Sequence, residues 1–387
     1  MKDLLFVCYG LGIGGIEKCL VNLINVLPEK EYSVDVLLMN SHYDLLKSQI
    51  TRTVNFVDDF KYVMNTEMTL NNIRSRGGVL RNLDKFIKYC IFRMVVKLGK
   101  NPVCLFKSLS KKYDVAIAYS HHDYSPKYVA DKVKAAKKVL WYHNGAYIKE
   151  GKAYQKDKEC FSAFDFIVAV STDCKNILKE KFAFLEDKFI VLRNICDVDH
   201  ILKKSREQLP LNFNKSAINI VTVGRLTKEK GADIAIEACK ILCDDGYNIC
   251  WHWIGDGNQV EIMEDKVKSM QIEDSFVFEG NQDNPYQYIN CADLYVQTSY
   301  YEAYSTTVTE AKVLCKPIVT TDVGGMRDQI KNGINGIITP ISAYELANAI
   351  KSLIENDDKR SRFSAELEKE RLYFTNSLKE YENTVFL

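Results

Sequence analysis

The sequence predicts an α/β protein made of two doubly wound domains that face each other across a cleft. Short apolar runs rich in β-branched residues alternate with amphipathic helical stretches along the whole chain. Apolar strands separated by helices are typical of parallel sheets covered on both faces. Two successive sets of such strands imply two domains, which fits a length of 387 residues.

A polar stretch near residues 193–214 separates the two sets of strands and is the expected hinge. It carries Pro210 and several asparagines, a composition typical of connecting segments. We therefore expect residues 1–195 to form an N-terminal domain and residues 196–371 a C-terminal domain. The strands expected in the first are Leu4–Tyr9, Val34–Met39, Val115–Tyr119, Lys138–Tyr142, Phe166–Val170 and Phe189–Leu192. Those expected in the second are Ile218–Val223, Ile249–Ile254, Phe276–Glu279, Leu294–Gln297, Pro317–Thr320 and Gly336–Ile338.

Composition and charge exclude several classes of protein. A net charge of +1 gives no reason to expect nucleic acid as a partner. The 12 cysteines include no C-x-x-C pair and no zinc-type spacing, which favours a reducing compartment. The apolar run in "MKDLLFVCYG" is too short for a signal peptide, and no later stretch approaches the ~20 apolar residues of a membrane span. We expect a cytoplasmic protein.

One segment, Arg74–Lys112, departs from the neutral balance. It holds eleven Lys and Arg residues against one acidic residue, Asp84. A basic amphipathic helix can lie on an anionic membrane, here the inner face of the plasma membrane. A solvated helix packed on its own domain is the alternative. The apolar residues that alternate with its cations are Leu80, Leu83, Phe86, Ile87, Cys90 and Ile91.

The glycine loop "GLGIGGIEK" directly follows the first expected strand. Gly10-x-Gly12-x-x-Gly15 matches the spacing of the dinucleotide-binding fingerprint. That fingerprint also needs an acidic residue at the end of the second strand to bind ribose. The second strand ends in Asn40-Ser41, so the sequence argues against an NAD-dependent dehydrogenase.

In the second domain, "VTVGRLTKEKG" places two cations on a turn between a strand and a helix. Gly224 ends the strand, and Arg225 and Lys230 follow it. Two cations beside a helix N-terminus suit a diphosphate, because free N–H groups and the helix dipole favour anions. The segment lacks the spacing of a Walker A loop. Solvated surface cations are the alternative interpretation.

"SYYEAYSTTVTEA" places two carboxylates, Glu302 and Glu310, on either side of small hydroxylated residues. Ser305 is an apt N-cap for a helix that contains Glu310, with the N–H groups of residues 306–308 left free. A carboxylate on that helix can accept two hydrogen bonds from a ribose diol, and one at the loop can accept from sugar hydroxyls. Such a pair could instead serve a glycosidase, or be surface charge.

These segments occur in one order with several others, and together they resemble a known family. "VGRLTKEKG", "WIGDGNQ", "FEGNQDNPYQYINCADLYVQTSYYEAYSTTVTEA", "KPIVTTDVGGMRDQI" and "NGINGIITP" look like the donor-binding domain of retaining GT-B glycosyltransferases of family four (glycosyl transferases group 1). "GIGGIEK", the hinge "LRNICDVD" and the tail "YFTNSLKEYENTVFL" also resemble it. The resemblance spans nearly the whole chain and implies that residues 372–387 cross back onto the first domain.

The resemblance implies a retaining hexosyltransferase that moves a sugar from a nucleotide-diphosphate sugar, expected to be a UDP-sugar, to a glycan or a lipid-linked acceptor such as a polyprenyl-diphosphate glycan. The setting would be surface polysaccharide biosynthesis. "KVLWYHNGAY" resembles the family segment whose histidine, here His143, faces the donor sugar. The catalytic residues it implies are His143, Glu302, Arg225 and Lys230. The donor-binding residues it implies are Gly14, Gly15, Gly224, Arg225, Lys230, Gln282, Asn284, Tyr286, Ala303, Tyr304, Ser305, Thr306 and Glu310.

On the acceptor side, His121, His122 and Asp123 follow the strand Val115–Tyr119 and are candidates to touch an acceptor. Their spacing is not that of a usual zinc site. Asp197-x-Asp199 formally matches the D-x-D of metal-dependent glycosyltransferases but lies in the hinge, so we interpret it as structural. The cations at 225 and 230 would replace a divalent ion, and we expect neither a metal nor a cofactor.

The sequence departs from the family pattern at one place. Members commonly have Glu-Gly-x-Gly or Glu-Gly-x-Pro where this chain has Glu302-Ala303-Tyr304-Ser305, which leaves the donor sugar open. Two further alternatives therefore stay open. One is a nucleotide-sugar epimerase of similar shape, and the other is a binding partner that has lost activity.

Overall fold

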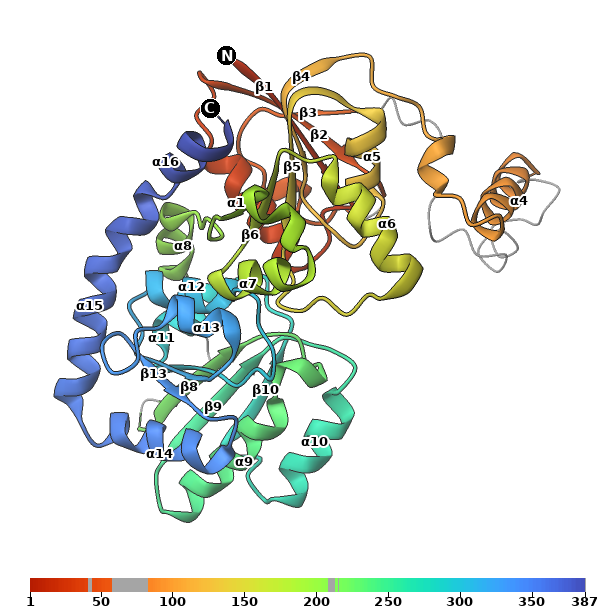
Figure 1. The fold of residues 1–387 in the computed structure, drawn as a ribbon. Coiled ribbons are helices and arrows are strands. Elements are labelled where there is room, and N and C mark those ends of the chain that lie inside the picture. The colour runs from red at the N-terminus through yellow and green to blue at the C-terminus, as the bar shows by residue number, and fades with distance from the viewer. Residues whose placement is uncertain (41–43, 58–82, 208–212, 215, 387) are drawn as a thin grey trace.

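The computed structural model describes residues 1–40, 44–57, 83–207, 213–214 and 216–386. Figure 1 shows two α/β units, one above the other, with the long helix α15 (Asp357–Asn376) running along the side of both. Each unit is a sheet of parallel strands with helices packed against it. The predicted fold class is therefore confirmed.

The N-terminal sheet has seven strands in the order β3-β2-β1-β4-β5-β6-β7. All neighbouring strands run parallel. The strand order reverses direction between β1 and β4, and ligands bind such sheets at the carboxyl edge of that point. The strands are β1 Lys2–Cys8, β2 Tyr32–Leu38, β3 Asn55–Phe56, β4 Lys112–Ala118, β5 Lys134–Tyr142, β6 Phe166–Ala169 and β7 Phe189–Val191. The helices are α1 Gly15–Val26, η1 Lys47–Gln49, α4 Leu83–Lys97, η2 Pro102–Leu105, α5 Ser125–Lys132, α6 Gly151–Ser162, α7 Thr172–Lys181 and η3 Ala183–Lys188.

The C-terminal sheet has six parallel strands in the order β10-β9-β8-β11-β12-β13. Its order reverses between β8 and β11, so the loops after these two strands lie beside each other. The strands are β8 Ile218–Val223, β9 Ile249–Ile254, β10 Phe276–Gly280, β11 Leu294–Gln297, β12 Ile318–Thr321 and β13 Ile337–Thr339. The helices are α8 Val198–Ser205, η4 Lys228–Lys230, α9 Ala232–Asp244, α10 Val260–Ser269, α11 Pro285–Cys291, α12 Thr306–Val313, α13 Gly324–Gln329 and α14 Ala343–Ile354.

The central strands are buried on both faces, which explains why they read as continuous apolar runs. The residues from Leu4 to Val7 in β1 are all 0% exposed, and so are Trp251 and Trp253 in β9. Every strand expected from the sequence is present. The strand β3 was not expected, because a pair of residues at the edge of a sheet has no apolar run to reveal it.

The end of the chain packs on the N-terminal unit. After α15, the short helices α16 (Leu378–Tyr381) and η5 (Glu382–Phe386) lie beside β1 and β2 (Figure 1). Tyr381 and Phe386 belong to the same apolar core as these strands, and the Tyr381 ring stacks on Trp141 with ring centroids 5.7 Å apart. The Tyr381 hydroxyl donates to the carbonyl of Arg193, which precedes α8.

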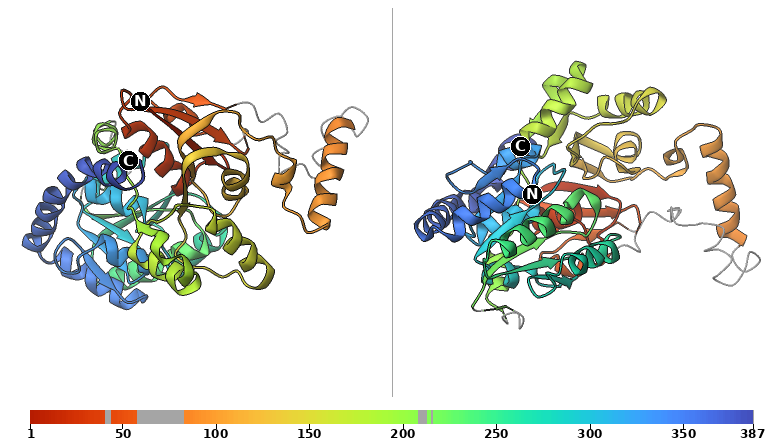
Figure 2. Two further views of the ribbon diagram at one scale, coloured as in Figure 1. Left: turned by 45° about the horizontal axis from the view of Figure 1, so that its top comes forward. Right: turned by 90° about the horizontal axis from the view of Figure 1, so that it is seen from below.

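Helix α4 stands away from the body of the molecule in Figure 1 and in both views of Figure 2. Phe92 and Val95 face inward, and the Phe92 ring meets the ring of Tyr124 edge-on at 6.4 Å. Residues 74–82 of the basic segment predicted from the sequence lie outside the described residues. The described part is helical from Leu83 to Lys97, as predicted.

Candidate functional site

The loops that follow β1 and β5 in the N-terminal sheet meet the loops that follow β8 and β11 in the C-terminal sheet. Gly145, after β5, packs so closely on the second unit that an added Cβ would lie 3.4 Å from the carbonyl oxygen of Glu302. Tyr301 donates a hydrogen bond from its hydroxyl to the side chain of Asn144. The two units therefore touch at the place where the predicted site residues gather.

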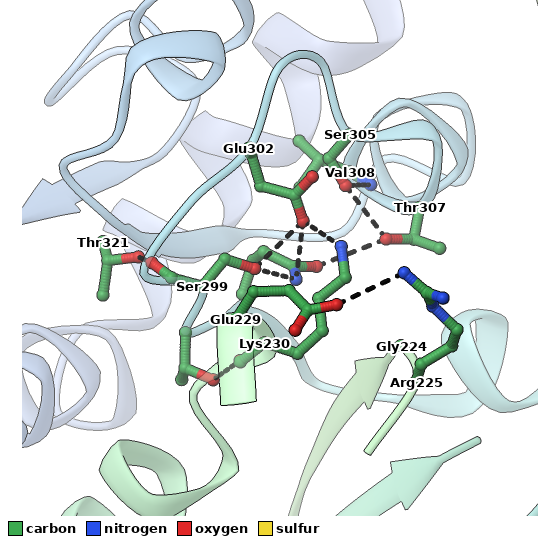
Figure 3. Close-up of polar contacts among 12 residues, drawn as sticks. Gly224, Arg225, Glu229, Lys230, Ser299, Glu302, Ser305, Thr307, Val308 and Thr321 are labelled. Atoms are coloured by element: carbon green, nitrogen blue, oxygen red, sulfur yellow. Dashed lines mark hydrogen bonds and ion pairs between the residues drawn. The ribbon is translucent and has the colours of Figure 1, made fainter. Parts of the chain in front are cut away.

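Arg225 and Lys230 follow β8, as the sequence predicts, but their settings differ. Figure 3 shows the Lys230 side chain pointing at the Glu302 carboxylate, with which it forms an ion pair. Arg225 lies at the exposed rim, where its side chain is 69% exposed and contacts Glu229 at 3.3 Å. The turn depends on Gly231, because its φ of 66° is left-handed and an added Cβ would overlap the carbonyl of Thr298.

Glu302 is held by polar side chains of β11 and the following loop (Figure 3). Its Oε1 accepts a hydrogen bond from the Ser299 hydroxyl at 3.0 Å, and Gln297 Nε2 lies 3.5 Å away. The Thr307 hydroxyl donates to the Gln297 amide oxygen at 3.2 Å. The carboxylate is thus fixed in a network that also reaches the first turn of α12.

Glu310 lies on α12, as predicted, and is only 2% exposed. Its Oε1 lies 2.6 Å from Nζ of Lys18, which belongs to α1 of the other unit. Burial lowers the pKa of Lys18, but the Glu310 carboxylate raises it further, so the net shift is upward. Within the described part of the chain, Oε2 of Glu310 is buried and has no hydrogen-bond partner.

Ser305 caps α12, which confirms that prediction, since its hydroxyl oxygen accepts from the N–H of Val308 at 3.3 Å. The expectation that the N–H groups of 306–308 are all free is therefore wrong for Val308, because a capping serine satisfies one of them. The N–H of Ser305 itself donates to Gln329 at 2.8 Å. The N–H groups of Thr306 and Thr307 head the helix beside Glu302.

The chain departs from the family pattern at Ala303 and Ser305, on either side of Tyr304. Ala303 packs against the apolar core of the N-terminal unit, although it comes from a loop of the other. Tyr304 is 8% exposed and belongs to the same core. A glycine in place of Ala303 would remove part of this contact between the units.

His143, at the end of β5, is a neutral imidazole under the Tyr119 ring, whose centroid is 4.9 Å away. Burial lowers its pKa to about 3, against a small upward effect of the Tyr119 backbone. Nε2 of His143 is buried and has no hydrogen-bond partner among the described residues.

His121, His122 and Asp123 divide between two roles. His121 is 8% exposed, and its Nδ1 accepts from the backbone N–H of His143 at 3.4 Å, so it supports that segment. His122 and Asp123 line a pocket of about 180 Å³ together with Tyr9 and Glu17. Burial lowers the pKa of both histidines and raises that of Glu17. The pocket wall therefore combines an imidazole and carboxyl groups at the carboxyl ends of β1 and β4.

Gly14 and Gly15 begin α1, with Gly14 as its N-cap. A Cβ at Gly14 would overlap the folded-back Glu17 carboxylate, whereas one at Gly15 would meet only Thr306, at 3.8 Å. The start of α1 therefore faces the start of α12 across the junction. Two helix N-termini and Lys230 together favour an anion between the units.

The donor-binding candidates Gln282, Asn284 and Tyr286 are only partly brought together. Tyr286 is buried on α11 with its ring 4.7 Å from Nζ of Lys18. Asn284 donates to the carbonyl of Lys204 at 2.9 Å, and Gln282 donates to that of Glu279 at 2.6 Å. These two side chains are engaged elsewhere, which leaves the backbone of the loop to contact a base.

Asp197 caps α8 by accepting from the N–H of His200 at 2.9 Å, so the structural interpretation of Asp197-x-Asp199 is confirmed. No group of three or more potential metal ligands occurs among the described residues. In the same part of the chain, no helix is both long and apolar enough to cross a membrane.

Comparison with known proteins agrees with this architecture. Residues 203–370 match the family model described as glycosyl transferases group 1. This part of the chain is therefore similar to the glycosyl transferases of group 1. It contains Arg225, Lys230, Glu302 and Glu310, and the site extends beyond it to α1 and β5.

Relatives cover most of the chain. An uncharacterized glycosyltransferase of Methanocaldococcus jannaschii is 24% identical over 70% of this chain and 81% of its own. An N-acetylgalactosaminyltransferase of Campylobacter jejuni, which acts on a diphospho-undecaprenol-linked sugar, is 22% identical over 94% of this chain and 93% of its own. HepE of Anabaena, solved with UDP, shares the fold with a TM-score of 0.70. It is 17% identical, and the match covers 99% of this chain and 100% of HepE. The fold is thus GT-B.

Proposed function

We propose that this chain is a retaining, metal-independent glycosyltransferase that moves a hexose from a UDP-sugar to a glycan or a polyprenyl-linked glycan in surface polysaccharide biosynthesis. The observation that carries the proposal is the junction of the two units. There two helix N-termini, Lys230 and two held carboxylates surround one place, and one carboxylate oxygen is buried without a partner in the part of the chain that the structure describes. The match of residues 203–370 to glycosyl transferases group 1 supports the transferase class, and the UDP in the HepE structure supports the nucleotide.

The donor diphosphate would lie between Lys230, Arg225 and the helix N-termini. Departure of a nucleoside diphosphate builds negative charge, and preorganised cations and N–H groups stabilise it. Lys230 would exchange Glu302 for the phosphate, which leaves the Glu302 carboxylate to accept from a sugar hydroxyl. Oε2 of Glu310 would accept from the ribose diol.

The donor sugar would lie toward His143. Because this imidazole is neutral and its Nε2 has no partner among the described residues, it would orient a sugar hydroxyl through Nε2 without carrying charge. The acceptor sugar would enter the pocket lined by His122 and Asp123. Its hydroxyl would attack on the face from which the diphosphate leaves, give its proton to the departing phosphate, and so retain the anomeric configuration.

The decisive experiment incubates the purified protein with a panel of nucleotide sugars, with and without a polyprenyl-diphosphate-linked glycan. Nucleotide release that requires the acceptor, and that persists in EDTA, is expected for one UDP-sugar. NMR of the product then gives the anomeric configuration. An altered sugar without nucleotide release would instead establish an epimerase, and binding without either change a non-catalytic partner.

We also propose that α4 rests on an anionic membrane, where a lipid-linked acceptor would lie. Ile87, Ile91, Met94 and Leu98 follow a single helical stripe and are 49%, 40%, 56% and 66% exposed. The cations Arg93 and Lys97 of α4, and Lys100 shortly after it, are exposed. Apolar area flanked by cations is the pattern that binds anionic headgroups.

Sedimentation with vesicles tests this surface. The protein is expected to bind phosphatidylglycerol vesicles in a salt-dependent manner, and Ile91→Ser/Met94→Ser is expected to abolish binding. Ile262→Ser, which changes an equally exposed residue on α10, is the matched control. Equal sedimentation of all three proteins would remove the membrane from the proposal.

A further inference from the structure

Lys18 is the one side chain of α1 that reaches across the junction to a carboxylate of the second unit. Its Nζ lies 2.6 Å from Oε1 of Glu310, and the two side chains are 25% and 2% exposed. The same Nζ lies over the Tyr286 ring. The sequence motifs did not draw attention to Lys18, because it looks like the first exposed cation of an ordinary amphipathic helix.

This pair differs from a purely structural ion pair. Taking both charges out of water costs several kcal/mol per ion, so such a pair stabilises the protein only when every polar atom is satisfied. Here Oε2 of Glu310 is buried and lacks a partner among the described residues. An unsatisfied carboxylate oxygen next to a held one is the arrangement expected where a ligand hydroxyl completes the network.

We propose that Lys18 positions the Glu310 carboxylate for the ribose diol, so that the N-terminal unit completes the nucleotide site of the C-terminal unit. The proposal rests on the proposed function and adds a residue to it. With Oε1 held by Lys18, Oε2 is left for one ribose hydroxyl. The ammonium has three donors, so it has capacity to donate to the oxygen of the second hydroxyl.

Nucleotide recognition then depends on contact between the units. Gly15 and Thr306 already bring α1 and α12 together, and Lys18 lies one turn further along α1. When the units part, Glu310 loses its cation and the carboxylate is no longer oriented. Binding of the ribose and closure of the units are therefore linked through one ion pair.

The test measures binding of UDP and of 2′,3′-dideoxy-UDP by isothermal titration calorimetry. Lys18→Met is expected to weaken UDP binding about tenfold and to remove most of the preference for UDP over the dideoxy analogue. Lys18→Arg is expected to keep most of both. Lys111→Met is the matched control, since Lys111 also pairs with a buried carboxylate, Asp35 at 3.2 Å, but lies outside the site.

A double-variant cycle shows whether Lys18 works through Glu310, and it avoids leaving a buried carboxylate unpaired. Glu310→Gln and Lys18→Met/Glu310→Gln are expected to bind UDP equally weakly. A double variant about tenfold weaker than Glu310→Gln would overturn the proposal. The proposal would also be overturned if Lys18→Met bound UDP with the affinity of the wild type and the same preference over the dideoxy analogue, or if it bound UDP more tightly. Absence of UDP binding by the wild type would refute the proposed function itself.

Discussion

The candidate site contains two lysine–glutamate pairs that differ in where their partners come from. Lys230 and Glu302 both belong to the C-terminal unit and lie on loops after neighbouring strands. Lys18 and Glu310 come from different units and meet only where these touch. The first pair is a property of one domain, whereas the second is a property of the assembled pair of domains. A motif in sequence can predict the first kind but gives no sign of the second.

Loss of the local cation should have the largest effect. Lys230→Ala is expected to lower kcat/KM about 10²- to 10³-fold, because it removes charge stabilisation from the leaving diphosphate. Steady-state release of UDP in the presence of acceptor measures this. Lys228→Ala, an exposed lysine of the same turn, is the control and should leave the rate unchanged. Equal rates for both variants would exclude Lys230 from the diphosphate site.

Glu310 and Glu302 should affect different steps of the reaction. Glu310→Gln is expected to raise the Kd for UDP about 10-fold, since a hydrogen bond to a charged group is lost. Glu302→Gln is expected to leave UDP binding nearly unchanged and to raise KM for the UDP-sugar, because Glu302 faces the sugar. Calorimetry with UDP alone and kinetics with the UDP-sugar distinguish the two. The same loss of UDP affinity in both would contradict this division.

Contact between the units can be weakened without touching either pair. Tyr304→Ala is expected to cost about 2–4 kcal/mol of stability, because a large buried side chain leaves a cavity in the N-terminal core. Thermal denaturation should show the loss, and UDP binding should weaken only a few-fold. Tyr344→Ala, which changes a tyrosine that is 61% exposed, should change neither the melting temperature nor the affinity for UDP. An unchanged melting temperature for Tyr304→Ala would argue against the contact.

The smallest effect expected is a pH dependence of stability that comes from His143. Its folded pKa of about 3 lies below the ordinary value of 6.5, so the unfolded state binds more protons between these values. Stability from this group is complete above about pH 6.5 and falls as the pH drops toward 3. His143→Gln should therefore lose fewer degrees of melting temperature than the wild type between pH 7 and pH 4.5. Parallel loss in both proteins would show that His143 is protonated when folded.

Much of the fold could be predicted because local patterns decide it. Strands buried on both faces leave apolar runs, and Ser305 before a helix marks a cap whose bond the structure contains. Lys230 and Glu302 could be predicted because each lies after a strand in a segment that resembles the family.

The remainder could not be predicted because it depends on partners far away in the chain. Tyr304 looks like a loop residue until the other unit's core is beside it, and Lys18 looks solvated until α12 is placed. Asn284 carries an amide suited to a base, yet it donates to α8. The sequence misleads for side chains whose partner in the folded protein comes from a distant part of the chain.

The packing of the chain's last helices on the first sheet has a consequence for biosynthesis. Tyr381, Val385 and Phe386 fill the same core as β1, and Lys2 donates to the carbonyl of Phe386 at 2.8 Å. The core around the first strands is therefore complete only when residues 381–386 have been made, after the strands of the C-terminal sheet, which span residues 218–339. The N-terminal unit expressed without these residues would expose the surface that they cover.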